Sequence, residues 1–291
     1  MPPHVGVSGP RKGAVPRAGR LVRAGVHVGA ALVLALSVYL GLIQLGLVRS
    51  PLAPSMSGDI ALARSEQAGL RVLFVGNSLT SANSMPALVH QLAAGDPGAP
   101  AIFAVRYTAP GWRLKRASRD DGLAALLEDV RWNVVVLQEQ SLIPSLSPYE
   151  RDREMSPFAR DLVSKIRASL ARPMLFMTWG YEKGDRENVP EDTFTAMQAR
   201  LAEGYSDQAA KLSVPVAPVG VAWAEALRRD PELELWEDDG KHPSRLGSYL
   251  TACVLYAILS KRAPTESGFT DGLTDAEARS LQQVAADVVH G

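Results

Sequence analysis

Cysteine is almost absent from this sequence, and acidic residues are missing from its first part. Cys253 is the one cysteine among 291 residues, which excludes an internal disulfide and any metal site built on several cysteines. Residues 1–50 contain six Lys and Arg residues but no Asp or Glu, so the remainder carries 25 basic against 31 acidic residues. Because residues 51–291 carry more acidic than basic residues, they do not suit a phosphate backbone, and we expect no nucleic-acid partner.

The sequence also lacks the patterns of common cofactor and metal sites. No phosphate-binding glycine loop or dinucleotide fingerprint occurs in a strand-to-helix turn. One acidic cluster comprises Glu232, Glu234, Glu237 and Asp238. It has neither the histidine spacing of a zinc site nor the regularly spaced oxygen ligands of a calcium- or magnesium-binding loop, so we interpret it as a solvent-exposed surface. We expect no cofactor and no metal.

Residues 24–48 form an apolar run without Lys, Arg, Asp or Glu, long enough to cross the ~30 Å hydrocarbon core of a bilayer as a helix. Five basic residues precede the run and only Arg49 follows it closely, so the positive-inside rule puts residues 1–23 in the cytoplasm as a basic tail. We predict a single-pass transmembrane signal anchor at 24–48, a linker over 49–67 and an extracytoplasmic domain beyond.

Two other interpretations of the apolar run remain open. The small residues Ala53 and Ser55 could mark a cleavage site, in which case the protein would be secreted. A cleaved signal peptide normally has an apolar stretch of only ~7 to 15 residues, which favours a retained anchor. A buried helix of a globular core is the third interpretation.

In residues 68–291, short apolar runs alternate with longer amphipathic ones, as in a parallel sheet covered by helices on both faces. We predict one α/β domain with five strands, at 71–75, 101–106, 133–138, 174–178 and 214–218. Helices are predicted at 85–94, 122–130, 153–171, 191–212, 243–259 and 274–289. Ligands of such sheets gather beyond the carboxyl ends of the strands. We therefore expect the functional residues in the loops that follow the strands.

The first predicted strand leads directly into Gly76-Asn77-Ser78-Leu79-Thr80. This position places the Ser78 hydroxyl beside the start of a helix, where backbone N–H groups can face a developing negative charge. Taken alone, such a serine more often ends a strand or caps a helix than attacks a substrate.

Histidine scarcity narrows the choice of a general base for Ser78, because a serine at neutral pH needs an adjacent base and histidine suits that role best. Four of the five histidines lie near the chain ends, in the apolar run or inside a predicted helix: His4, His290, His27 and His90. His242 remains, in a polar loop with Asp239 three residues upstream. A turn there would let the carboxylate fix the imidazole tautomer that accepts the Ser78 proton. Without Ser78, an ordinary surface turn would explain the loop equally well.

The two motifs resemble blocks I and V of the SGNH (GDSL-like) hydrolases. Gly-Asn-Ser-Leu-Thr corresponds to block I, with Asn77 in place of the commoner aspartate, and Asp-Gly-Lys-His-Pro-Ser corresponds to block V. The resemblance implies a three-layer, flavodoxin-like domain with a five-stranded parallel sheet. It also implies a catalytic triad of Ser78, His242 and Asp239.

The resemblance further implies an oxyanion hole made by the Ser78 N–H, a block II glycine and a block III asparagine. Gly111 fits block II. Block III departs from the usual pattern, because residues 138–141 read Gln-Glu-Gln-Ser, as in a related branch of the family. We expect Gln140 to supply the amide donor, with Gln138 as the substitute, although the longer side chain requires a shifted backbone.

Several residues near these motifs are candidates for a substrate pocket. Asn77 precedes the nucleophile, Trp112 follows Gly111, and Trp179 and Tyr181 follow the fourth predicted strand. The three aromatic rings are equally consistent with core positions, since rings with a polar handle suit both settings.

The resemblance and the predicted export together imply a membrane-anchored serine esterase acting on a small O-acyl ester, with an acylated carbohydrate as one possible substrate. An O-acyltransferase that uses the same acyl-serine and an inert carbohydrate-binding module remain alternatives. An α/β-hydrolase fits less well, because position 80 is threonine where its Gly-x-Ser-x-Gly elbow needs glycine.

Overall fold

The computed structural model describes residues 54–58, 60–65 and 69–291. The predicted basic tail at 1–23 and the predicted signal anchor at 24–48 lie outside the described residues. Within them, no helix combines the length and the apolar character needed to cross a membrane.

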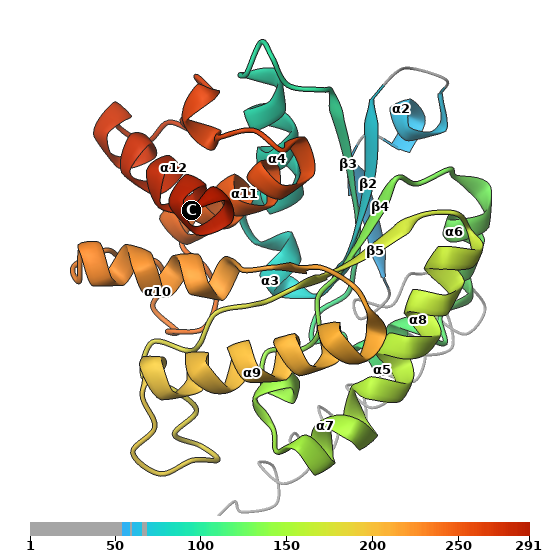
Figure 1. Ribbon diagram of the computed structural model, residues 1–291, viewed down its shortest axis with the longest axis horizontal. Helices are drawn as coiled ribbons and strands as arrows, with labels where there is room; N and C mark the ends of the chain where they lie inside the picture. Colours follow the sequence, from blue (N-terminus) through green and yellow to red (C-terminus); the bar gives the residue numbers. More distant parts are fainter. Residues whose placement is uncertain (1–53, 59, 66–68) are drawn as a thin grey trace, which may run out of the picture. The chain divides into compact units, whose positions relative to one another are not determined.

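A sheet lies at the centre of this domain (Figure 1). It has six strands in the order β1-β3-β2-β4-β5-β6. Neighbours from β3 to β6 pair in parallel. In chain order these strands are β2 (Leu70–Gly76), β3 (Ile102–Thr108), β4 (Val134–Leu137), β5 (Arg172–Phe176) and β6 (Val216–Ala217). Their spatial order is flavodoxin-like and reverses at β2, so a ligand is expected beyond the carboxyl ends of β2 and its neighbours.

The predicted sheet of five parallel strands lacked one strand. β1 (Ser55–Gly58) pairs antiparallel with β3 and makes the sheet mixed. β1 and the short helix α2 (Ile60–Arg64) both fall within the segment predicted as a linker, 49–67. All four β1 residues are exposed, so the strand has no alternating apolar pattern that a sequence could reveal. Backbone pairing at the sheet edge is what forms it.

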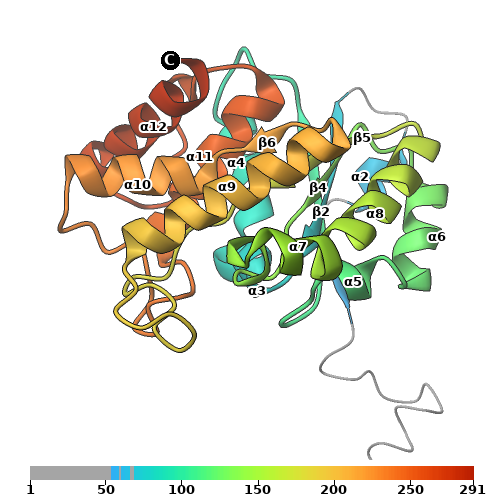
Figure 2. The ribbon, with the colours of Figure 1, turned by 60° about the horizontal axis from the view of Figure 1, so that its bottom comes forward.

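Helices cover both faces of the sheet (Figure 1, Figure 2). One face carries α4 (Met85–Ala94), α10 (Val219–Arg229), α11 (Arg245–Ser260) and α12 (Asp275–His290). The other carries α5 (Leu114–Ala117), α6 (Asp121–Asp129), α8 (Ser156–Ala168) and α9 (Phe194–Leu212). This arrangement confirms the α/β prediction.

The central strands are buried on both sides. In β2, Val72 and Phe74 pack into the core beneath α4 and α11, whereas Leu73 and Val75 pack into the core on the opposite face. Strands covered on both faces are apolar throughout rather than alternating, which is why β2 and β4 read as continuous hydrophobic runs.

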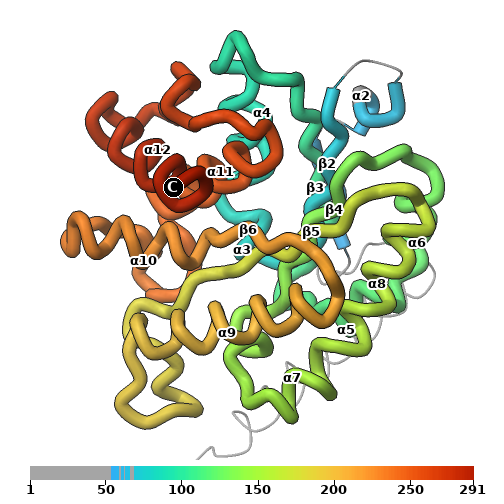
Figure 3. The backbone as a smooth tube through the Cα atoms, viewed as in Figure 1, coloured from blue at the N-terminus to red at the C-terminus, as the bar shows by residue number. Residues whose placement is uncertain are grey.

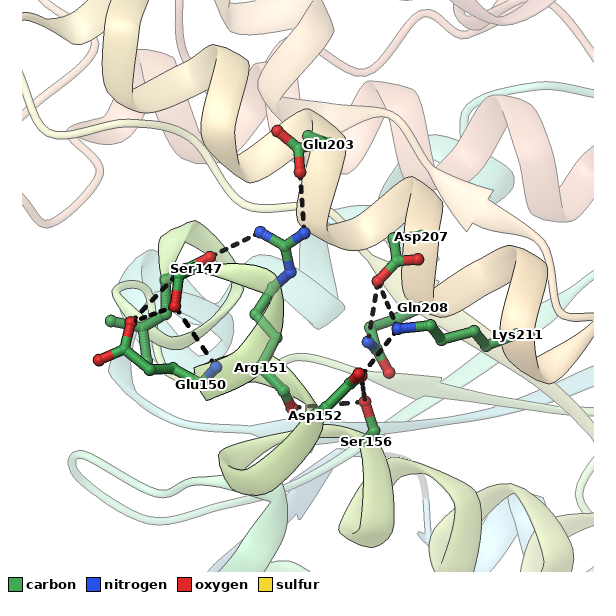
Figure 4. A network of polar contacts seen from close by, with 10 residues as sticks. Ser147, Glu150, Arg151, Asp152, Ser156, Glu203, Asp207, Gln208 and Lys211 are labelled. Atoms are coloured by element: carbon green, nitrogen blue, oxygen red, sulfur yellow. Dashed lines mark hydrogen bonds and ion pairs between the residues drawn. The ribbon is translucent and has the colours of Figure 1, made fainter.

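A polar network ties the segment after β4 to α9 (Figure 4). Arg151, in α7 (Pro148–Glu154), is buried and donates to Glu203 Oε1 on α9 at 2.9 Å and to the Leu146 carbonyl at 2.6 Å. Lys211 on α9 contacts Asp152 at 2.7 Å. The chain between β4 and α8, which begins with residues 138–141, is thereby held against a long helix.

Candidate active site

Ser78 is the first residue of the short helix α3 (Ser78–Ser81), directly beyond the carboxyl end of β2. Asn77 caps this helix, because its Oδ1 accepts the Leu79 N–H at 3.1 Å. Its Nδ2 donates to the Trp112 carbonyl at 2.9 Å and so joins the turn to the loop after β3. A Cβ at Gly76 would collide with the side chains of Gln138 and Thr80, so a larger residue there would displace both of them.

His242 lies in the loop between α10 and α11 and reaches Ser78 from a position 164 residues later in the chain. Its Nε2 is 2.9 Å from Ser78 Oγ, and its Nδ1 is 2.5 Å from Asp239 Oδ2. Asp239 Oδ1 accepts the backbone N–H groups of Lys241 and His242 at 2.8 and 2.9 Å. The structure therefore brings together the three side chains that the sequence predicts as a triad.

The hydrogen bonds around Asp239 keep its carboxylate ionised. Partial burial acts to raise its pKa, but the His242 ring and the backbone N–H groups of His242 and Lys241 outweigh burial and lower the pKa to about 2. An ionised carboxylate favours the imidazole tautomer with its proton on Nδ1. His242 Nε2 is then free to accept the proton of Ser78.

Contacts from the segment after β5 hold the His242 loop. Trp179 Nε1 donates to the Lys241 carbonyl at 3.1 Å, and the Glu182 N–H donates to the Gly240 carbonyl at 2.9 Å. Gly240 has a φ of 64°, a left-handed conformation that glycine adopts without strain. Gly240 thus allows the tight turn that brings the side chains of Asp239 and His242 together.

Asn83 joins the Ser78 segment to the His242 loop, and sequence reasoning did not identify it. Its Nδ2 donates to the Pro243 carbonyl at 3.0 Å and to Ser248 Oγ at 2.9 Å. Asn83 and Ser84 have φ values of 48° and 54°, between α3 and α4. Turn-forming residues in succession before a helix do indicate a turn at Asn83. They do not reveal that its side chain binds a residue 160 positions later in the chain. Figure 3 shows the path of the chain from α3 through α4 and from α10 to α11.

A cavity of about 130 Å³ lies beside Ser78. Its lining includes predicted and unpredicted residues: Asn77, Ser78, Leu79, Gly111, Gln140, Ser141, Tyr181, Lys241 and His242. Gly111 has a φ of 62° and open space where a Cβ would lie. The backbone N–H groups of Ser78 and Gly111 form no hydrogen bond with another described residue. Both are therefore available to an oxyanion in this cavity.

The two glutamines of 138–141 have different positions. Gln138 is buried; its Oε1 accepts the Asn77 N–H at 2.9 Å and the Thr80 hydroxyl at 2.8 Å, while its Nε2 donates to the Glu139 carbonyl. Gln140 lines the cavity, and its Oε1 accepts the Leu142 N–H at 3.0 Å. Among the described residues, its Nε2 contacts only Ser141 Oγ, at 3.5 Å. Gln140 thus has an amide N–H to offer the cavity, whereas Gln138 supports the Ser78 turn.

The structure separates the aromatic pocket candidates. Tyr181 lines the cavity, and its hydroxyl lies 2.7 Å from Ser141 Oγ. Trp112 and Trp179 are buried in the core and do not line this cavity, which corrects their prediction as pocket residues. Trp179 stacks on Trp223 with ring centroids 4.2 Å apart, so the ring fills the space beneath α10.

Comparison with solved structures identifies the family of this chain. No family model and no curated protein matches the chain. A protein of Slackia heliotrinireducens described as a candidate SGNH hydrolase is 30% identical in sequence, with 65% of this chain and 97% of that chain covered and a TM-score of 0.53. The chain belongs to the SGNH hydrolase family.

Two further solved structures share the fold of this SGNH hydrolase. A DUF4886 family protein from Bacteroides uniformis is 18% identical, with 76% of this chain and 94% of that chain covered and a TM-score of 0.64. A lipase/acylhydrolase from Enterococcus faecalis is also 18% identical, with 66% and 96% covered and a TM-score of 0.50. Among the described residues, no group of three or more His, Cys, Asp and Glu side chains is placed to hold a metal ion.

Proposed function

We propose that this SGNH hydrolase is a serine esterase that hydrolyses a small O-acyl ester through an acyl-Ser78 intermediate. The observation that supports the proposal is the chain of contacts from Ser78 through His242 to Asp239, beside a cavity that offers unpaired N–H groups. Nucleophile, base and orienting carboxylate stand in the order that nucleophilic catalysis requires.

The proposed reaction has two steps. Ser78 Oγ attacks the ester carbonyl while His242 Nε2 takes its proton, and the N–H groups of Ser78 and Gly111 with the Gln140 amide stabilise the oxyanion. His242 then protonates the departing alcohol and leaves the acyl group on Ser78. Water, deprotonated by His242, attacks this ester in the second step and releases the acid and the free serine.

The surroundings of Ser78 favour a short acyl group and a polar alcohol. The cavity beside Ser78 measures about 130 Å³, a size that favours a short acyl group. Lys241 and Tyr181 also border a hollow of about 240 Å³ with many charged side chains. Such a hollow suits a hydroxyl-rich alcohol, and we propose an acylated carbohydrate as the substrate class.

Hydrolysis of p-nitrophenyl acetate by the full-length chain tests the esterase proposal. Ser78→Ala should reduce kcat by at least ~10³-fold, because the remaining groups cannot replace the nucleophile. Ser81→Ala is the matched control, since it removes a neighbouring α3 hydroxyl that makes no contact with His242, and it should keep wild-type activity. Full activity in Ser78→Ala would show that the proposed triad is wrong.

We also propose that residues 24–48 anchor the enzyme at the extracytoplasmic face of a membrane, with residues 1–23 in the cytoplasm. The length of the apolar run and the bias of basic residues support this placement. Membranes from cells that express the full chain should retain it through an alkaline carbonate wash, with an intact mass that includes residue 1. A soluble product beginning near residue 54 would instead support secretion after cleavage.

A further inference from the structure

Glu139 is a buried carboxyl group that the proposed reaction does not use. Its exposed fraction is 0%, and it does not line the cavity beside Ser78, so it cannot touch a substrate there. Burying an ionisable group is unfavourable unless hydrogen bonds compensate, and an apolar side chain at this position would avoid the penalty. Its presence between Gln138 and Gln140 therefore needs an explanation.

The contacts of Glu139 join two segments of the oxyanion site. Its Oε1 accepts the backbone N–H of Leu114 at 3.1 Å and that of Gln140 at 2.7 Å. Leu114 begins α5, three residues after Gly111, and Gln140 carries the amide that faces the cavity. One oxygen atom thus connects the loop after β3 with the loop after β4.

We propose that Glu139 is a positioning residue that sets the spacing between the Gly111 and Gln140 oxyanion donors by accepting the backbone N–H groups of Leu114 and Gln140 with a single oxygen. The inference rests on the proposed esterase function. Oxyanion donors must lie close to their ideal positions, because a misplacement of ~1 Å can reduce the rate ~100-fold.

The acceptor oxygen, rather than the negative charge, carries this role. The second oxygen, Oε2, is buried and accepts no hydrogen bond from a described residue. Burial is the largest influence on Glu139 and disfavours its ionised form; the Gln140 and Leu114 N–H groups and then Arg113 favour that form, and Glu154 disfavours it. The buried hydroxyl of Tyr205 lies nearby. A neutral group with an oxygen at the Oε1 position should therefore hold both loops.

Three substitutions in the full-length chain distinguish the effect of the side-chain length of Glu139 from the effect of its charge. Glu139→Gln keeps an oxygen at the same reach without the charge, Glu139→Asp keeps the charge on a shorter side chain, and Glu139→Leu removes the acceptor. With p-nitrophenyl acetate, the Gln variant should keep kcat within ~3-fold of wild type. The Asp and Leu variants should lose kcat by ~100-fold with KM changed less than ~3-fold, as expected for misplaced oxyanion donors.

Asn133→Leu is the matched control. Asn133 Oδ1 also accepts a backbone N–H, that of Arg71 at 2.8 Å, but at the opposite end of β4. This variant should lose stability and keep kcat. All rates are expressed per site titrated to completion by a fluorophosphonate, so that misfolded protein is not counted, and the contrast between Asp and Gln remains informative if the Leu variant does not fold.

Wild-type kcat in the Asp or Leu variant overturns the inference, as does a Gln variant impaired as strongly as Asp. A failure of the proposed function would give a different result. In that case, Ser78→Ala would hydrolyse p-nitrophenyl acetate as the wild type does, whatever residue occupies position 139.

Discussion

Asp239 orients His242 in the proposed mechanism, and its substitution tests that role. Asp239→Asn removes the charge that stabilises the imidazolium and allows the wrong tautomer of His242. We expect kcat for p-nitrophenyl acetate to fall by ~10² to 10⁴-fold with little change in KM. Glu237→Gln, on the same loop, removes an exposed carboxylate that makes no side-chain contact with His242 and serves as the control. Equal rates in the two variants would contradict the assignment of Asp239.

The triad residues could be predicted from sequence because each half of the motif is local. Ser78 follows an obvious strand, and Asp239 and His242 are three residues apart in a chain with few histidines. The roles of Gln138 and Gln140 could not be separated in this way. Both are glutamines beside the same strand, and only the direction of each side chain in space shows that Gln138 lies behind Ser78 while Gln140 faces the cavity.

The positions of the aromatic residues could not be distinguished from the sequence either. Trp179 and Tyr181 are two positions apart after β5, yet one is buried against Trp223 and the other borders the cavity. The side-chain types suit both places, so composition gives no basis for a choice.

At the scale of elements, Asn83 links the α3–α4 turn to the start of α11 and so fixes the distance between Ser78 and His242. Asn83→Gly keeps the left-handed backbone and removes only the side-chain bonds, and kcat should fall by ~10-fold, about 1.4 kcal/mol in the barrier. Asn83→Ala should show the same kcat and a further loss of ~1 kcal/mol in stability, because alanine disfavours a positive φ. Kinetics and urea denaturation measure the two effects; wild-type kcat in the Gly variant would refute the link.

Elements with strong local signals were predictable and the others were not. The bounds of α4 match the prediction, and α12 lies where a helix was predicted, with Thr274 and Glu277 forming a capping box at its start. α10 went unpredicted because its first turn, Val-Gly-Val-Ala, has low helix propensity and follows β6 almost directly. Burial of Trp223 and its neighbours in the core stabilises this helix instead. The edge strand β1 forms by pairing with β3, which lies far away in the sequence, so the residues around β1 alone do not predict it.

For the molecule as a whole, stability should depend on pH through Glu139. Burial raises the pKa of Glu139 from 4.5 to about 7. Between these values the folded chain holds a proton that the unfolded chain has released, so this group makes stability decrease as pH rises from about 4.5 to about 7. Asp96 acts in the opposite direction, because its bonds to Arg262 lower its pKa to about 2 and its contribution is lost only in acid.

Thermal denaturation of the full-length chain at pH 5 and pH 8 checks this expectation. Glu139→Gln stays neutral at both pH values, so its Tm should exceed that of the wild type by much more at pH 8 than at pH 5. A Tm difference that is the same at both pH values would show that Glu139 does not titrate between them.

The central claim is that Ser78 is a nucleophile activated by His242, and covalent labelling tests it most directly. The full-length chain is treated with a fluorophosphonate, and the modified peptide is located by mass spectrometry. We predict one adduct, on Ser78, absent from Ser78→Ala and formed at least ~100-fold more slowly in His242→Ala because the hydroxyl then lacks its base. An adduct on another residue, or no adduct while p-nitrophenyl acetate is still hydrolysed, would contradict the account.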